Sequence, residues 1–380
     1  MRLNRRRFHR TSRGRPRVVA AGLALILAAA GAGGFVASQQ ATPGPQVRLT
    51  GGPLPVAIPV APPAPKTLQD RLDELVRAYG EDVGVAVTDV DAGWTAGVDA
   101  EGVYPQQSVS KLWVAIAVLK AVDEGRLSPD QPVFLGEADR SVFFQPISHN
   151  IGANGYTTEL SALLRRAIVQ SDNAANDRLI KEAGGPGAVE AALEALALEG
   201  VTVGAYERDL QAKVAGLSWR PEYGTGWNFQ AAREQLPAAV REAALQAYLA
   251  EPLDGARPAG VTRALARLHK GELLSPASTQ HLLALLQDVR TGPRRLKGGL
   301  PAGWTIGHKT GTGQDYRGAS VGINDVGLLT APDGRTYAVA VMMRRTHKPV
   351  PQRLEFMQAI TREVAAEWAR SGTPGLVEAD

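Results

Sequence analysis

The order of strand and helix patterns along the chain is the feature that most constrains its fold. Strand-like apolar segments lie at both ends of the region from Thr67 to residue 371, and helical patterns lie between them. The expected strands are 83–90, 94–98, 304–309, 321–329 and 337–343. Turn residues join the first two strands at Asp91-Ala92-Gly93 and the last two at Asp333-Gly334. Amphipathic helices are expected at the two ends of this region, over 68–79 and 353–371.

The middle of the region has the periodicity of helices. Helical stretches are expected around 108–125, 158–170, 186–198, 230–250, 259–270 and 276–289. The terminal strands pair most economically in one sheet, with the helices inserted between them. We therefore predict an α/β (α+β) fold, in which terminal helices flank an antiparallel sheet that carries an inserted all-α subdomain.

The positive charge of the chain is confined to its first residues. Of 380 residues, 42 are Lys or Arg and 38 are Asp or Glu, so the formal net charge is +4. Eight arginines and no acidic residue lie in residues 1–17, which leaves 34 basic and 38 acidic residues, about −4, for the rest. A hydrophobic content of 44% excludes disorder of the whole chain. Because the chain has no Cys, it has no disulfide, thiol nucleophile or Cys-ligated metal.

An apolar run follows the arginines directly. Residues 18–37 are uncharged and long enough to cross a bilayer, and the preceding basic residues favour a cytoplasmic N-terminus. We predict a basic cytoplasmic tail over 1–17 and a signal peptide or transmembrane anchor over 18–37, in preference to a nucleic-acid-binding arm. Residues 38–66 contain eight prolines and are expected to be an extended linker. The domain of residues 67–380 would then be exported to the periplasm or cell surface, tethered to the inner membrane.

Ser108-Val109-Ser110-Lys111 opens a predicted helix. Residues three apart on a helix share a face, so the Lys111 amine can reach the Ser108 hydroxyl. A desolvated lysine can accept the proton of a serine nucleophile, and free N–H groups at the helix start can stabilise an oxyanion. Alone, this motif also fits a serine near a helix cap with a solvated lysine.

Two further motifs follow it. Ser171-Asp172-Asn173 could relay a proton to a leaving nitrogen through Ser171 and bind a substrate amide through Asn173, with Asp172 bracing the loop. Lys309-Thr310-Gly311 ends a predicted strand, where Lys309 and Thr310 would attract a carboxylate and Gly311 would let a ligand approach. The backbone N–H groups of Ser108 and Thr312 would form the oxyanion hole. Each motif has an ordinary structural explanation, but their joint order is improbable by chance.

The three motifs in this order resemble class A β-lactamases and penicillin-binding serine hydrolases. The resemblance covers about residues 67–371. Further matching stretches are Tyr104-Pro105, 171–176 (SDNAAN), 184–186, 271–274, 300–304 and 324–325. The resemblance implies acylation of Ser108 by a β-lactam or a related acyl compound.

One loop departs from the family pattern. Class A enzymes carry a Trp-Glu-Pro-Glu-Leu-Asn loop whose first Glu activates the deacylating water. The similar stretch here begins at Trp219, so that Arg220 replaces the Glu and Gly224 replaces the Asn. An arginine cannot be a general base. Glu222 or Glu207 could substitute, although a surface or salt-bridge role is favoured for both.

Other candidate residues carry less information. His308 adjoins Lys309 on a strand and is expected on the opposite face, and the six His residues show no metal-ligand spacing. Phe143 and Phe144 could line the cleft or pack in the core. No metal and no cofactor are predicted.

The sequence therefore predicts an exported serine hydrolase that acts on a small-molecule β-lactam or a peptidoglycan-derived peptide. Ser108 would attack, Lys111 would deprotonate it, and Ser171 would assist the leaving group. A monomer is expected, with no nucleic-acid partner and with the N-terminal segment contacting the membrane. The alternatives are a D-Ala-D-Ala peptidase or esterase of the same fold and a non-hydrolytic penicillin-binding sensor, which the Arg220 loop would suit.

Overall fold

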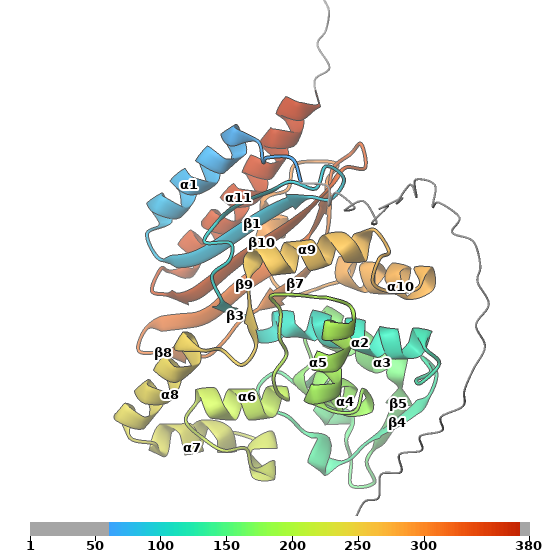
Figure 1. The fold of residues 1–380 in the computed structure, drawn as a ribbon. Helices are drawn as coiled ribbons and strands as arrows, with labels where there is room; N and C mark the ends of the chain where they lie inside the picture. Colours follow the sequence, from blue (N-terminus) through green and yellow to red (C-terminus); the bar gives the residue numbers. More distant parts are fainter. Residues whose placement is uncertain (1–60, 373–380) are drawn as a thin grey trace, which may run out of the picture. The chain divides into compact units, whose positions relative to one another are not determined.

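The computed structural model describes residues 61–372 (Figure 1). The expected basic tail, the apolar segment and all but the last six residues of the expected linker lie outside the described residues. Within residues 61–372, no helix has the length and apolarity needed to cross a membrane.

The N- and C-terminal strands pair in one antiparallel sheet. Its order is β2 (Thr95–Val98), β1 (Asp82–Asp89), β10 (Thr336–Thr346), β9 (Ala319–Thr330) and β7 (Thr305–Gly311), with β8 (Asp315–Tyr316) also paired to β9. The register sets Val85 of β1 opposite Val341 of β10, although 256 positions separate them in the chain. The predicted sheet is therefore confirmed, and β9 and β10 extend beyond the expected bounds because both faces of these strands are buried.

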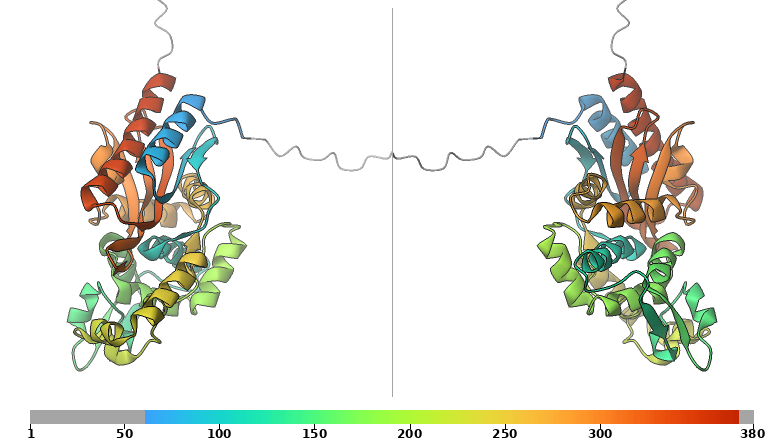
Figure 2. Two further views of the ribbon diagram at one scale, coloured as in Figure 1. Left: turned by 90° about the vertical axis from the view of Figure 1, so that its left-hand side faces the viewer. Right: turned by 90° about the vertical axis from the view of Figure 1, so that its right-hand side faces the viewer.

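Helices cover both faces of this sheet. The terminal helices α1 (Lys66–Tyr79) and α11 (Val350–Ser371) lie side by side on one face, as the views in Figure 2 show. Helices α9 (Pro258–His269) and α10 (Pro276–Gln287) lie on the other face, next to the helical subdomain (Figure 1). One apolar core fills the space beneath α1 and α11, and a larger one joins the sheet to the subdomain.

The helical subdomain is built around α2 (Lys111–Asp123). This helix is buried almost all round, because its apolar residues occupy every face of it. The other subdomain helices are α3 (Leu160–Arg165), α4 (Asn173–Glu182), α5 (Pro186–Ala195), α6 (Glu207–Val214), α7 (Asn228–Gln235) and α8 (Ala238–Ala250). Helices α4 and α6 were not predicted from the sequence.

The prediction of an all-α subdomain is wrong in detail. Two short antiparallel pairs occur there, β4 (Pro132–Leu135) with β5 (Tyr156–Glu159), and β3 (Tyr104–Pro105) with β6 (Gly255–Ala256). The predicted helix 230–250 is two helices, because Pro237 lacks the N–H that would continue α7.

The core beneath α11 yields a stability prediction. Ile360 of α11 is fully buried in that core, whereas Val350 at the start of the same helix is exposed. We expect Ile360→Ala to lower the free energy of unfolding by about 2–5 kcal/mol, because it leaves a cavity. Val350→Ala should change it by less than about 0.5 kcal/mol. Urea unfolding of the two variants measures both values, and equal effects would contradict the assignment of this core.

Candidate active site

A strained turn presents Ser108 at the start of α2. The preceding Gln107 has φ +53°, and its backbone N–H donates to the Asp254 carboxylate over 2.6 Å. Ser108 lies in a short 3₁₀ turn, Gln107–Ser110, which leads directly into α2. The serine therefore precedes the α-helix and does not lie inside it, and the free N–H groups of the helix start are close to its side chain.

Strand β9 fixes the segment before the serine. Asn324 of β9 is completely buried, and its amide donates to the carbonyls of Pro105 and Gln106 over 2.8 and 2.9 Å. Gly311 at the end of β7 is needed for the same approach, because a Cβ there would lie 2.2 Å from the Gln106 carbonyl oxygen. Contact with the serine segment therefore accounts for Gly311, in addition to the ligand approach expected from its place at the end of the strand.

Lys111 connects the serine to an acidic group. Its side chain is completely buried, and Nζ donates to Ser108 Oγ over 2.9 Å and to Glu207 Oε2 over 2.6 Å. The 2.9 Å distance fits the role predicted from the three-residue spacing of Ser108 and Lys111. A buried ammonium needs such partners, because an unpaired charge in the protein interior is strongly unfavourable.

Glu207 is the first residue of α6 and lies inside the site. Its side chain is 4% exposed, and the other carboxylate oxygen accepts from Gln211 Nε2 over 2.8 Å. Burial alone would raise the pKa of Glu207, but the Lys111 charge and hydrogen bonds hold that pKa below its usual value. The site therefore holds a carboxylate within reach of both Lys111 and the cavity that Ser108 lines.

The structure corrects the interpretation of the Arg220 loop. The Arg220 and Glu222 side chains are 67% and 55% exposed and lie 3.8 Å apart as a surface pair. Both carboxylates form ion pairs, as was favoured, but Glu222 does so at the surface, whereas Glu207 is buried against Lys111. Arg220 and Gly224 do not line the cavity that Ser108 lines, so they replace no group there. Glu207 and Gln211 are four residues apart on α6, and this spacing could have predicted that their side chains contact each other.

Asp177 of α4 holds the start of α6 in place. Its carboxylate accepts from the backbone N–H groups of Glu207 and Arg208 over 2.6 and 3.2 Å, and from Ser141 Oγ over 2.7 Å. Burial raises the pKa of Asp177 to about 7, and the nearby Glu207 carboxylate adds to this rise. Asp177 therefore positions Glu207 through its backbone.

Ser171 and Lys309 form a second hydroxyl–lysine pair. A π-helical turn, Arg166–Gln170, ends at Ser171, whose φ is +63°. Lys309 Nζ donates to Ser171 Oγ over 3.0 Å. Burial, together with the Lys111 charge, lowers the pKa of Lys309 well below its usual value. Asp172 caps α4 by accepting from the Ala175 N–H over 3.0 Å, which fits the bracing role predicted for it.

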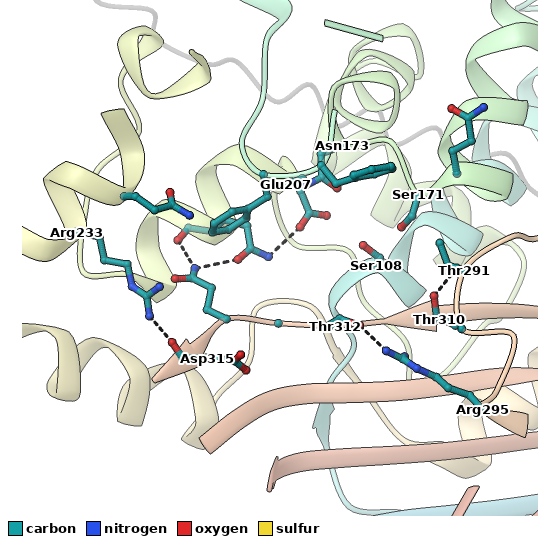
Figure 3. Close-up of a pocket in the computed structure, with 18 residues that line it drawn as sticks. Ser108, Ser171, Asn173, Glu207, Arg233, Thr291, Arg295, Thr310, Thr312 and Asp315 are labelled. Carbon is teal, nitrogen blue, oxygen red and sulfur yellow. Dashed lines mark hydrogen bonds between the residues drawn. The ribbon is translucent and has the colours of Figure 1, made fainter. Parts of the chain in front are cut away.

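Asn173 and Thr310 lie on the cavity wall with their side chains already bonded. Asn173 donates to the Val142 carbonyl over 2.8 Å, and the Thr310 hydroxyl lies 2.6 Å from that of Thr291. Ser108, Ser171, Glu207 and Thr312 line the same cavity (Figure 3). The cavity volume is about 510 Å³, so the motifs from three distant parts of the sequence meet around one space.

Arg295 was not predicted from the sequence. Its guanidinium donates to Thr312 Oγ1 over 2.7 Å and to the Gly311 carbonyl over 2.9 Å. The next residue, Leu296, is held by Asp325 of β9 and by Thr361 of α11. No short motif marks this arginine, because its place depends on packing against two remote elements.

The three remaining candidates, Phe143, Phe144 and His308, lie in different surroundings. Phe143 and Phe144 line the cavity, with exposed fractions of 40% and 58%, so the alternative of core packing does not apply. His308 is buried with Nδ1 2.9 Å from Asp325 Oδ1 and does not line the cavity. In residues 61–372, no group of three or more His, Asp or Glu side chains is arranged to hold a metal ion.

Comparisons with known protein families and solved structures agree with this arrangement of site residues. The sequence model of the beta-lactamase enzyme family matches residues 67–368. The chain belongs to the β-lactamase enzyme family. It is therefore an enzyme, a serine hydrolase of the class A β-lactamase type.

Relatives of this β-lactamase-family chain are similar over most of its length. Beta-lactamase VEB-1 of Pseudomonas aeruginosa is 26% identical, over 72% of this chain and 81% of that protein. The crystal structure of a beta-lactamase from Chitinophaga pinensis has a TM-score of 0.65 and 27% identity, and the match covers 80% of this chain and 100% of that one. An ancestral class A beta-lactamase has a TM-score of 0.61 and 28% identity, over 79% and 99% of the two chains.

The raised pKa of Asp177 predicts a pH-dependent stability. Its folded-state pKa of about 7 lies above the ordinary 3.8, so its contribution is fully present below about pH 4 and is lost as the pH rises through 7. Asn cannot ionise. The free energy of unfolding of Asp177→Asn, relative to wild type, should therefore increase between pH 4 and 7, by at most about 1.4 kcal/mol per pH unit.

Urea unfolding at a series of pH values tests this expectation. The exposed Asp130 provides the control, because Asp130→Asn removes a carboxyl group without removing a buried one. If the difference in free energy of unfolding between Asp177→Asn and wild type stays constant with pH, the raised pKa of Asp177 is contradicted.

Proposed function

We propose that the protein hydrolyses β-lactams through an acyl-enzyme on Ser108, with Glu207 as the base that releases the acyl group. The observation that carries this proposal is the buried series Ser108–Lys111–Glu207, with distances of 2.9 and 2.6 Å. It supplies a nucleophile, a proton carrier and a carboxylate in one site.

Acylation begins with removal of the Ser108 proton. Glu207 takes a proton from Lys111, and the neutral amine then accepts the proton of Ser108 as Oγ attacks the lactam carbonyl carbon. The N–H groups of Ser108 and Thr312 stabilise the oxyanion. When the C–N bond breaks, the leaving nitrogen receives a proton through Ser171, which Lys309 supplies by its 3.0 Å hydrogen bond. The proton held by Glu207 then passes to Lys309 through water in the cavity, so that the Glu207 carboxylate and the Lys309 ammonium are both restored before deacylation.

Deacylation uses the same carboxylate on a water molecule. Glu207 removes a proton from the water as the water oxygen attacks the ester carbonyl, and the proton returns to Ser108 Oγ when the ester bond breaks. Gln211 binds one oxygen of Glu207 and Lys111 the other, so the carboxylate is oriented before the substrate arrives. Asp177 adds to this orientation through the backbone of Glu207.

The buried position of Glu207 favours turnover over a penicillin-binding sensor. A sensor that stays acylated needs a site without a general base beside the ester. Here the Glu207 carboxylate on α6 lines the cavity beside Ser108, which supports its role as that base. The positive groups Lys309 and Arg295 near Thr310 and Thr312 suit the carboxylate of a β-lactam nucleus.

We also propose that this domain acts outside the cytoplasm as a monomer tethered to the inner membrane. The support is the sequence order of an arginine tail over 1–17, an apolar run over 18–37 and a Pro-rich stretch over 38–66.

The proposed deacylation step predicts a trapped intermediate. Glu207→Gln should still acylate with a penicillin, because without the Glu207 charge burial favours the neutral Lys111 amine that accepts the Ser108 proton. It should deacylate at least about 100-fold more slowly, because the general base that activates the water is lost. Intact-mass spectrometry against time, with substrate loss followed in the same sample, measures both steps. Glu222→Gln is the matched control, because it makes the same chemical change at an exposed carboxylate beside Arg220. This variant should hydrolyse penicillin at the rate of wild type.

Two outcomes would contradict the proposal. Normal turnover by Glu207→Gln would exclude Glu207 as the base, and a persistent adduct on wild type would favour a sensor or slow peptidase. Ser108→Ala should form no adduct and hydrolyse nothing, since the nucleophilic oxygen is gone.

The proposed location predicts where the activity is found. In cells that express the full chain, penicillin hydrolysis should sediment with the membrane fraction. Limited proteolysis in the stretch 38–66 should then release it in soluble form. Activity in the cytosolic fraction, without proteolysis, would contradict the tethered and exported arrangement.

A further inference from the structure

A second cationic group reaches the cavity from α7. Arg233 lines the cavity that Ser108 also lines, and Figure 3 shows it on the side away from Arg295. Its Nη2 donates to the backbone carbonyl of Asp315 over 2.7 Å, which ties α7 to β8. The side chain is half-buried, so it is partly shielded from solvent but remains open to the cavity.

The charge of Arg233 is not neutralised by a close carboxylate. Among residues 61–372, no carboxylate oxygen lies within 4.0 Å of its guanidinium nitrogens. The Asp315 carboxylate lines the same cavity and accepts a hydrogen bond from Ser320 Oγ over 2.6 Å. Burial and the Arg241 charge lower the pKa of Arg233, partly countered by Asp315, so an added anion would be favourable there.

The surrounding cavity wall offers a neutral hydrogen-bond donor beside Arg233. The amide of Gln230 lines the cavity together with Arg233, whereas Gln314 Nε2 already donates to the backbone carbonyl and to Oε1 of Gln211, each over 2.9 Å. A guanidinium beside an amide binds a carboxylate with directed hydrogen bonds as well as charge. Lys309 and Arg295, which suit the carboxylate of the β-lactam nucleus, lie near Thr310 and Thr312. The free end of an acyl side chain would then extend toward the opposite side of the cavity, where Arg233 lies.

We propose that Arg233 is a specificity-determining residue that binds an anionic group at the end of the substrate's acyl side chain. This inference rests on the proposed β-lactam hydrolysis. The preferred substrates are N-acyl β-lactams whose side chain ends in a carboxylate. Arg233 takes no part in bond making or breaking.

The competing explanation is a purely structural role, in which Arg233 only holds α7 against β8. Loss of that contact would lower the melting temperature and would affect all substrates alike. Recognition of an anion instead changes the ratio between two substrates that differ by one carboxylate. The two explanations therefore predict different measurements.

The test compares hexanoyl- and adipoyl-6-aminopenicillanic acid, whose six-carbon side chains differ in a terminal carboxylate. Wild type should have the higher kcat/KM for the adipoyl compound. Arg233→Gln should reduce the adipoyl-to-hexanoyl ratio about tenfold, because a charged hydrogen bond is lost. Arg233→Lys should retain part of the ratio, since it keeps the charge.

Arg317→Gln is the matched control. Arg317 is 63% exposed, follows β8 directly and does not line the cavity, so its loss changes the net charge equally without altering the proposed site. Its ratio should equal that of wild type. An unchanged ratio in Arg233→Gln, or an equal fall in Arg317→Gln, would overturn the proposal.

A binding measurement separates this inference from the proposed hydrolysis. Dissociation constants of both compounds are measured by calorimetry on Ser108→Ala and on Ser108→Ala with Arg233→Gln. If wild type hydrolyses neither compound, the proposed function fails, and the ratio of the two constants still tests Arg233. Tighter adipoyl binding that Arg233→Gln abolishes supports the proposal, and equal binding of both compounds overturns it.

Discussion

The active site depends on one buried ion pair, between Lys111 and Glu207. Both side chains are almost without solvent contact, so each charge is stable only because the other is present. Removing one partner of such a pair typically costs about 3–5 kcal/mol. The pair also fixes the chemistry, since Lys111 points its ammonium group at Ser108 and Glu207 faces the same cavity. Stability and reactivity are therefore coupled in this part of the molecule.

The sheet brings the partners of this ion pair together with the rest of the site. Strand β9 holds the serine segment through Asn324, and neighbouring β7 carries Lys309 to Ser171. The loop with Arg295 is held by β9 and α11, which come from the C-terminal part of the chain. The pairing of the first and last strands thus determines the distance between the motifs.

Local sequence patterns were sufficient to predict the sheet and to find the three site motifs. Alternating and continuous apolar segments predict strands directly, and the spacing of Ser108 and Lys111 predicts their contact. Helices α4 and α6 were missed because both are short and begin with polar residues that belong to the site. The Trp-x-Pro pattern aligned Arg220 with the deacylating Glu of the family, but Arg220 lies at the surface. Helix packing brings the Glu207 carboxylate of α6 beside Lys111, and a local pattern cannot reveal such packing.

The sequence by itself determined the fold class and pointed to Ser108 and the two lysines as site residues, because these depend on short-range periodicity and on residue types that few other sites need together. Only the tertiary structure decided which glutamate joins the site, that Asp177 holds it, and that Arg295 and Arg233 enter the same cavity. Those assignments depend on contacts between residues tens to hundreds of positions apart. Burial and electrostatic pairing select such contacts, and neither can be evaluated before the chain is folded.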